Sequence, residues 1–110
     1  MFLVVDGPAN EIDMPSRPNV DIVWLHRRDA AAPDQLLVDA VARASFPDGT
    51  YDVFVHGEAG ETRAVRKHLI ADRGFDATGA SISPYWRRTF TDEDWRQVKR
   101  QWIAEQALDA

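Results

Sequence analysis

The sequence contains no cysteine, and this absence excludes disulfide bonds, thiolate metal sites and cysteine nucleophiles together. Its apolar runs are short: Phe2–Val5 is typical, whereas a membrane-spanning helix needs about 20 consecutive apolar residues. The chain carries 13 basic and 18 acidic residues, so it lacks the basic surplus with which nucleic-acid-binding domains contact phosphates. We therefore predict a cytoplasmic protein that neither inserts into a membrane nor binds nucleic acid.

What the sequence does contain is typical of one folded domain. Of its 110 residues, 45% are apolar and 28% are charged, which is enough apolar surface for one modest core. We therefore predict that residues 1–110 form a single domain.

Short apolar runs alternate with segments of helical periodicity. Strands are predicted at residues 2–5, 20–25, 51–56 and 80–83. Helices are predicted at 33–44 and 57–73, and a third begins after Thr91, which has the character of an N-cap.

Strands separated by helices pair in parallel through right-handed crossovers, so the predicted fold class is α/β, a three-layer sandwich with helices on both faces of the sheet. Such sheets bind ligands beyond the carboxyl ends of their strands. Residues 6–11, 26–29, 56–60 and 86–88 are expected at that edge. The strand, glycine turn and helix that open a dinucleotide-binding fold are missing from the sequence.

Three segments carry a family signature in their order along the chain. They are Trp24-Leu25-His26-Arg27, then His56-Gly57-Glu58-Ala59 with Arg63 and Leu69 after it, and Tyr85-Trp86-Arg87-Arg88 with Thr91 and Trp95 after it. These segments resemble those of siderophore-interacting proteins, a family of flavin-dependent ferric-siderophore reductases. What they match is the carboxy-terminal nicotinamide-nucleotide domain of that family.

The resemblance implies a Rossmann-like domain of the ferredoxin-reductase type, with a mainly parallel sheet of about four strands, truncated at its amino end. The family's FAD-binding β-barrel has no counterpart in this sequence, so FAD is expected only through a partner domain. Two positions depart from the family pattern, because Pro84 and Thr89 stand where the family has glycine.

The resemblance also implies a cofactor-binding set. His26, Arg27 and Arg28 follow a strand where related folds meet the 2′-phosphate of NADPH, which a guanidinium holds by two hydrogen bonds. The Gly57-Glu58 turn lies where the nicotinamide would approach the flavin, and Glu58 disfavours a phosphate at the helix that follows.

The last two members of the set, Trp86 and Arg87, are expected at the same edge. Trp86 is a candidate for contact with the flavin ring, and Arg87, with Arg88, for contact with a carboxylate, a catecholate or a flavin phosphate.

Each of these residues also has a purely structural interpretation. Gly57 serves equally as a hinge between strand and helix, and Arg27 and Arg28 as solvated side chains. For Trp86 the structural interpretation, packing against neighbouring side chains, is favoured over contact with a flavin. Arg87 and Arg88 serve equally as a brace against the acidic residues 92–94.

The remaining candidates favour packing over chemistry. Trp24, Trp95 and Trp102 are expected in the core, because they lie in a strand or on one helical stripe. The three histidines do not have the spacing of metal ligands, and the sequence holds no nucleophile elbow, so we predict neither a metal site nor a catalytic residue.

Three classes of function remain open. In the first, the chain is the nucleotide-binding half of a siderophore-interacting protein, which binds NADPH weakly and reduces ferric siderophore only with a separate flavin domain. In the second, it binds a nucleotide or siderophore without turnover. In the third, it is an interaction module whose free sheet edge pairs with a partner or with a second copy in a homodimer.

Overall fold

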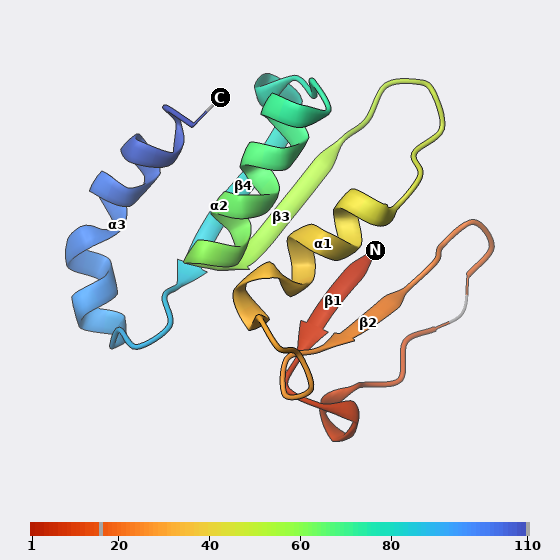
Figure 1. The fold of residues 1–110 in the computed structure, drawn as a ribbon, viewed down its shortest axis with the longest axis horizontal. Helices are drawn as coiled ribbons and strands as arrows, with labels where there is room; N and C mark the ends of the chain where they lie inside the picture. The colour runs from red at the N-terminus through yellow and green to blue at the C-terminus, as the bar shows by residue number, and fades with distance from the viewer. Residues whose placement is uncertain (16, 110) are drawn as a thin grey trace. The chain divides into compact units, whose positions relative to one another are not determined.

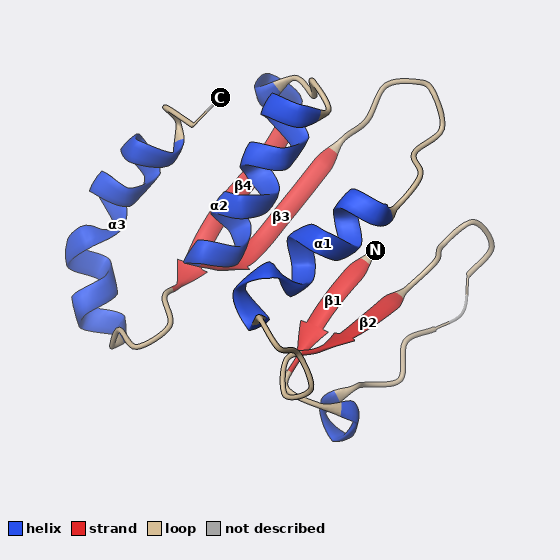
Figure 2. Cartoon of the chain, viewed as in Figure 1, coloured by secondary structure: helices blue, strands red, loops and turns tan. Residues whose placement is uncertain are grey.

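The structure is a computed structural model that describes residues 1–15 and 17–109. The chain divides into two compact units, Met1–Ala44 and Ser45–Ala110. Each unit contains one pair of parallel strands with a helix packed against it (Figures 1 and 2). The assignment of residues 1–110 to a single domain stays a prediction.

In the first unit, strand β1 (Phe2–Val5) pairs in parallel with β2 (Val23–His26), with Val5 opposite His26. Helix α1 (Leu36–Arg43) packs against β1 and buries Ala40 and Val41. The predicted helix 33–44 is confirmed, although Pro33–Gln35 form a single 3₁₀ turn, a common form of a helix's first turn. A further 3₁₀ turn, Pro8–Asn10, follows β1.

In the second unit, strand β3 (Val53–Glu58) pairs in parallel with β4 (Ala80–Trp86), with Val53 opposite Ala80. Helix α2 (Ala59–Lys67) continues as one π-helical turn, His68–Asp72, and packs against both strands. In Figure 1, α2 lies in front of the two strands. A 3₁₀ turn, Ala77–Gly79, leads into β4.

Helix α3 (Asp92–Gln106) contacts β4 and completes the second unit. The predicted N-cap is confirmed, because the Thr91 hydroxyl accepts a hydrogen bond from the Asp94 amide at 3.1 Å. The core of this unit consists of side chains from α2, the π turn and α3, among them Val65, Leu69 and Trp95. Burial of Trp95 confirms its predicted core position.

An ion pair joins α2 to the residues that follow α3. The Arg63 guanidinium donates to both carboxylate oxygens of Asp109, at 2.7 and 3.0 Å. These hydrogen bonds lower the pKa of Asp109 below its ordinary value and raise that of Arg63. Beside them, Arg66 donates to the backbone carbonyl of Gln106 at 2.7 Å, so both contacts hold α3 against α2.

The α/β class with parallel strands is therefore confirmed. All four predicted strands are present, but they pair two by two in separate two-stranded sheets. A single sheet of about four strands and the three Rossmann-like layers are not confirmed by these pairings.

Two strand ends differ from the prediction. Strand β3 continues through Gly57 to Glu58, and β4 continues through Pro84 to Trp86, so Trp86 ends its strand instead of following it. The register shifts where Gly57 faces Pro84 and Glu58 faces Trp86, which makes Tyr85 the extra residue of a bulge. Proline lacks an amide proton and is tolerated beside such a bulge, which explains why Pro84 does not end β4.

The second departure from the family pattern also has a structural reason. Thr89, where the resemblance led us to expect glycine, has φ of +69°, in the left-handed region that a β-branched residue rarely adopts. Glycine adopts this region without steric cost.

We expect Thr89→Gly to raise the free energy of unfolding by about 1 kcal/mol. The change relieves the strain of a left-handed threonine, and the greater entropy of glycine in the unfolded chain offsets part of that gain. Urea denaturation measures the change. Thr89→Ala, which removes the hydroxyl but keeps a Cβ, is the control and should gain less. A Thr89→Gly protein that is less stable than the parent would contradict this assignment of strain.

Candidate functional site

The carboxyl end of β2 carries the first group of predicted residues. His26 Nε2 lies 2.5 Å from Glu11 Oε2, so the loop after β1 is held at the end of β2. Arg28 donates from its guanidinium to Asp6 at 2.9 Å, while its backbone amide donates to the Asp6 carbonyl at 2.8 Å. The ends of β1 and β2 thus bring Glu11 to His26 and Asp6 to Arg28, as predicted for one edge of a sheet.

This group fits an anion only in part. The Arg28 side chain is 64% exposed and presents its guanidinium to solvent, which suits a phosphate. Asp6 competes for the same guanidinium. A Cβ on Gly7 would lie 3.4 Å from the Arg28 Cζ, so the absence of a side chain there lets Arg28 lie against the backbone.

The carboxyl end of β3 is organised by the Glu58 side chain, which is 4% exposed. Its Oε1 accepts from the Glu61 amide at 2.9 Å and so caps α2. Its Oε2 accepts from the Arg88 amide at 3.1 Å. We call these two hydrogen bonds the Glu58 clasp. The carboxylate occupies the positive end of α2, where a phosphate would otherwise bind, in agreement with the prediction.

Gly57 precedes the clasp and has φ of +154°, a conformation that side chains rarely adopt. A Cβ built at Gly57 would meet no atom within 4 Å. The backbone is therefore open to an approaching ligand, and the glycine is required by its dihedral angle instead of by a close neighbour. Both of its predicted roles, hinge and approach point, are compatible with this geometry.

Trp86 lies opposite Glu58 in the strand register and is 39% exposed. Arg87 lies over two rings, with its Cζ 4.2 Å from the centroid of Phe90 and 4.5 Å from that of Trp102. The side chain of Arg88 donates to Glu61 at 3.4 Å. The sequence predicted that Arg87 and Arg88 brace α3 through the acidic residues 92–94. The observed contacts are made instead with the rings of Phe90 and Trp102 and with Glu61.

The structure thus gathers the predicted residues into two groups, one in each unit. His26, Arg27 and Arg28 lie together at the end of β2, and Gly57, Glu58, Trp86 and Arg87 lie at the ends of β3 and β4. Trp24 and Trp102 are only half-buried, which places them at the margin of the predicted core.

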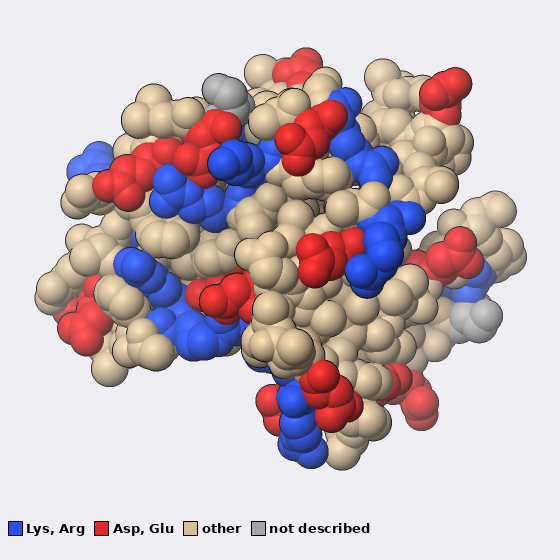
Figure 3. All heavy atoms as spheres, viewed as in Figure 1, with Lys and Arg blue, Asp and Glu red and all other residues tan. Residues whose placement is uncertain are grey.

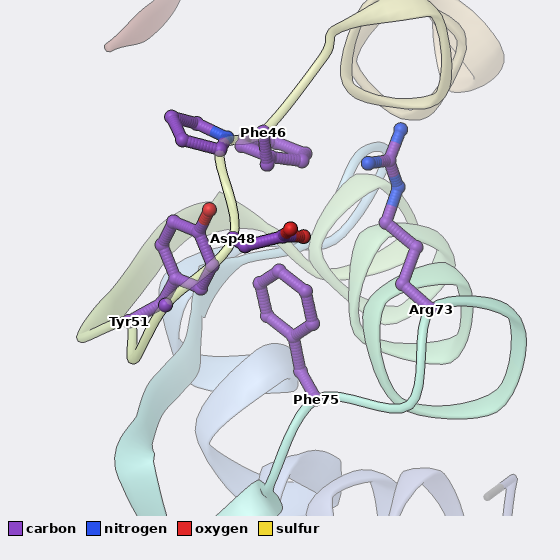
Figure 4. A pocket seen from close by; sticks show the side chains of 7 residues that line it. Phe46, Asp48, Tyr51, Arg73 and Phe75 are labelled. Carbon is purple, nitrogen blue, oxygen red and sulfur yellow. The ribbon is translucent and has the colours of Figure 1, made fainter.

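A cavity of about 260 Å³ in the second unit was not anticipated (Figure 4). The Tyr51 and Phe75 rings stack at 5.3 Å, Phe46 meets both edge-on at 6.0 Å, and Arg73 lies 4.5 Å above Phe46. Its lining residues precede β3 and β4, at the strand ends opposite the Glu58 clasp: Phe46, Pro47, Asp48, Gly49, Tyr51, Arg73 and Phe75. The aromatic residues on either side of the Asp48-Gly49 turn were the signal for this cluster.

Acidic and basic side chains lie beside one another over the described part of the face drawn in Figure 3. Among residues 1–15 and 17–109, no group of three or more histidine, aspartate and glutamate side chains is placed to hold a metal ion. Within the same residues, no helix has the length and apolar character needed to span a membrane.

We expect Glu58→Ala to lower the free energy of unfolding by roughly 2–3 kcal/mol, because it removes a helix cap and leaves the Arg88 amide without its acceptor. Thr91→Ala, which removes only the cap of α3, should cost about 1 kcal/mol. Urea denaturation gives both values. Hydrogen exchange at the Arg88 amide should accelerate in Glu58→Ala alone, and equal exchange in the two variants would show that the clasp does not hold this loop.

Comparison with known proteins gives a consistent result. The family model described as "Siderophore-interacting protein" matches residues 1–89. Uncharacterized proteins of Mycobacterium bovis and Mycobacterium tuberculosis are each 34% identical over 110 residues, which cover 91% of this chain and 39% of theirs. The crystal structure of a siderophore utilization protein from T. fusca superimposes with a TM-score of 0.67 and 31% identity, covering 83% of this chain and 35% of that one.

The chain therefore spans less than half the length of the relatives it matches. The match includes both strand pairs and the predicted segments at their carboxyl ends, since it extends from residue 1 to residue 89. The resemblance read from the sequence is confirmed, and the chain belongs to the siderophore-interacting protein family.

Proposed function

We propose that this chain is the nicotinamide-nucleotide-binding part of a cytoplasmic ferric-siderophore reductase and that it works together with a flavin-binding domain. The observation that carries the proposal is the family match over residues 1–89, which includes both parallel strand pairs. A Rossmann-like form of the nucleotide domain is part of the proposal, since parallel strands joined through helices are its building units.

The chemistry belongs to the cofactors. A bound NADPH would supply a hydride to the flavin of the partner domain, and the reduced flavin would pass single electrons to two ferric ions in turn. The residues of this chain bind and orient the nucleotide, and ferric siderophore is therefore an indirect substrate.

In the first unit, Arg28 and Arg27 are proposed to contact the 2′-phosphate that distinguishes NADPH from NADH. Arg28 supports this role because its guanidinium is largely exposed at the carboxyl end of β2. His26 is proposed to shape the edge of the same site, since Glu11 holds its ring there. Asp6 keeps the site weak, because a phosphate has to compete with its carboxylate for Arg28.

In the second unit, the open backbone at Gly57 is proposed as the approach point for the nicotinamide. The Glu58 clasp supports this proposal because the Glu58 carboxylate disfavours a phosphate at the start of α2. The open space at Gly57 is therefore better suited to the uncharged ring of the nucleotide. Trp86 presents an exposed aromatic side chain opposite Glu58, where a planar ring can stack. Arg87 is held over Phe90 and Trp102 and would supply a fixed positive charge.

We expect the chain to bind NADPH with a dissociation constant of about 1 mM and NADH roughly tenfold more weakly, a difference of about 1.4 kcal/mol. Replacing both Arg27 and Arg28 by alanine should abolish this preference and leave the fold intact, because neither side chain belongs to the core. Nuclear magnetic resonance titrations with each nucleotide measure affinity, and chemical shifts locate the site.

Asp6→Asn should change NADPH affinity in the direction opposite to the double arginine variant. It removes the charge that competes for Arg28, so NADPH should bind more tightly while NADH is unaffected. Equal, diffuse shifts with both nucleotides in the parent protein would instead make these arginines ordinary surface residues and would count against nucleotide binding.

The 110-residue chain by itself should be colourless and should show no NADPH-dependent reduction of a ferric siderophore. The reason is that a flavin is needed to accept two electrons as a hydride and to pass them singly to ferric iron, and this sequence contains no flavin barrel. Absorbance at flavin wavelengths and a ferrous-chelator assay check both points. Yellow protein with turnover would show that this chain holds flavin unaided.

A further inference from the structure

One face of the β3–β4 pair is lined with exposed aromatic side chains. Successive residues of a strand point to opposite faces, and α2 packs against the face that carries the fully buried Pro84. On the other face, Phe54 is 75% exposed and Tyr85 is 59% exposed. Together with His56 between them, these side chains form what we call the aromatic face.

The aromatic face is internally ordered. The Phe54 ring stacks on the His56 ring with centroids 3.8 Å apart, and the Tyr85 ring meets His56 edge-on at 4.6 Å. His56 Nε2 lies 3.1 Å from the Ser81 hydroxyl, which fixes the imidazole between the strands. Side chains already held in place lose little entropy on binding, so this face is preorganised for a contact.

Exposure of such a face is unusual for parallel strands. Sheets of parallel strands have both faces covered, because the helices that connect the strands lie on them. In the second unit, α2 packs on the opposite side, and α3 reaches the aromatic face through Lys99, whose Nζ lies 5.8 Å from the centroid of the Tyr85 ring. Phe54 nevertheless remains 75% exposed and Tyr85 59% exposed. An exposed phenylalanine and an exposed tyrosine, with His56 between them, therefore indicate that this face lacks a cover among the described residues.

The comparisons indicate where that cover comes from. This chain corresponds to 39% of the length of its mycobacterial relatives and 35% of the T. fusca protein. More than half of each relative thus lies outside the matched region. In an α/β fold the element that covers a sheet face is a helix with an apolar side.

We propose that the aromatic face binds an apolar helix from the complementary part of a siderophore-interacting protein, the part that this chain does not match. Phe54 and Tyr85 are the anchors of this contact, and His56 and Ser81 hold them. The identity of the partner as the flavin-bearing part rests on the function proposed above, whereas the location of the contact rests on exposure and strand geometry.

The test uses the complementary part of the T. fusca protein, prepared as a separate fragment and selected as yellow, FAD-loaded material. Isothermal calorimetry with the full 110-residue chain should show saturable binding. The Phe54→Ser, Tyr85→Ser double variant should bind roughly 10- to 100-fold more weakly, equivalent to about 1.4–2.8 kcal/mol. In the parent chain, chemical-shift changes should include Phe54, His56 and Tyr85.

Leu108→Ser is the matched control. Leu108 is 83% exposed and lies beyond α3, so its replacement removes a similar exposed apolar side chain from another place and should leave binding unchanged. Circular dichroism and urea denaturation confirm that the variants fold. Phe54→Leu, which keeps an apolar anchor, should restore most of the affinity.

Three results would overturn the proposal: no binding by the yellow fragment, equal binding by the Phe54→Ser, Tyr85→Ser variant, or a homodimer that only Phe54→Ser dissociates. The last would assign the aromatic face to a second copy of this chain. The nucleotide titrations are independent of these measurements. Docking without nucleotide binding would refute the proposed cofactor role alone, and nucleotide binding without docking would refute only the helix contact.

Discussion

The second unit depends on one buried carboxylate. Each oxygen of Glu58 accepts one backbone amide, from Glu61 at the start of α2 and from Arg88 in the loop after β4. A single side chain thereby connects the end of β3, the beginning of the helix and the chain leaving the neighbouring strand. Because the carboxylate is buried, these hydrogen bonds do not compete with water, and losing either partner would leave a buried polar group unsatisfied.

The clasp also limits what this end of the strands can bind. In nucleotide-binding folds of the Rossmann type, the pyrophosphate lies at the N-terminus of the helix after the first strand. Here the Glu58 carboxylate already accepts the Glu61 amide at the start of α2, so a phosphate would have to compete with this buried carboxylate. Arg88 is engaged with Glu61, and Arg87 lies over two rings. Of the two arginine pairs noted in the sequence, the pair at the end of β2 is thus better suited to a phosphate, since Arg28 presents most of its side chain to solvent.

Local patterns in the sequence predicted the elements well and their ends less well. Thr91 was recognisable as a cap because its hydroxyl needs only the amide three residues on, a contact that lies within one turn of helix. The continuation of β4 to Trp86 was not recognisable, because it depends on the bulge at Tyr85, which forms only when β4 pairs with β3. Likewise, Glu58 was placed in the first turn of a helix, but its contact with Arg88 joins residues 30 positions apart. The stacking of Tyr51 on Phe75 is equally nonlocal, and a family signature carries no information on it.

The two departures from the family pattern, Pro84 and Thr89, lie on either side of the Arg87-Arg88 segment. Pro84 is buried beside the bulge, and Thr89 holds a left-handed conformation. Strained backbone persists only where its surroundings over-determine it. Here the Arg88 amide is bound to Glu58, and the Phe90 amide donates to the Arg87 carbonyl at 3.1 Å, so the residues on both sides of Thr89 are fixed. Glycine would not need this support. The clasp therefore fixes the residue before Thr89, which explains how the loop keeps this left-handed conformation with a threonine.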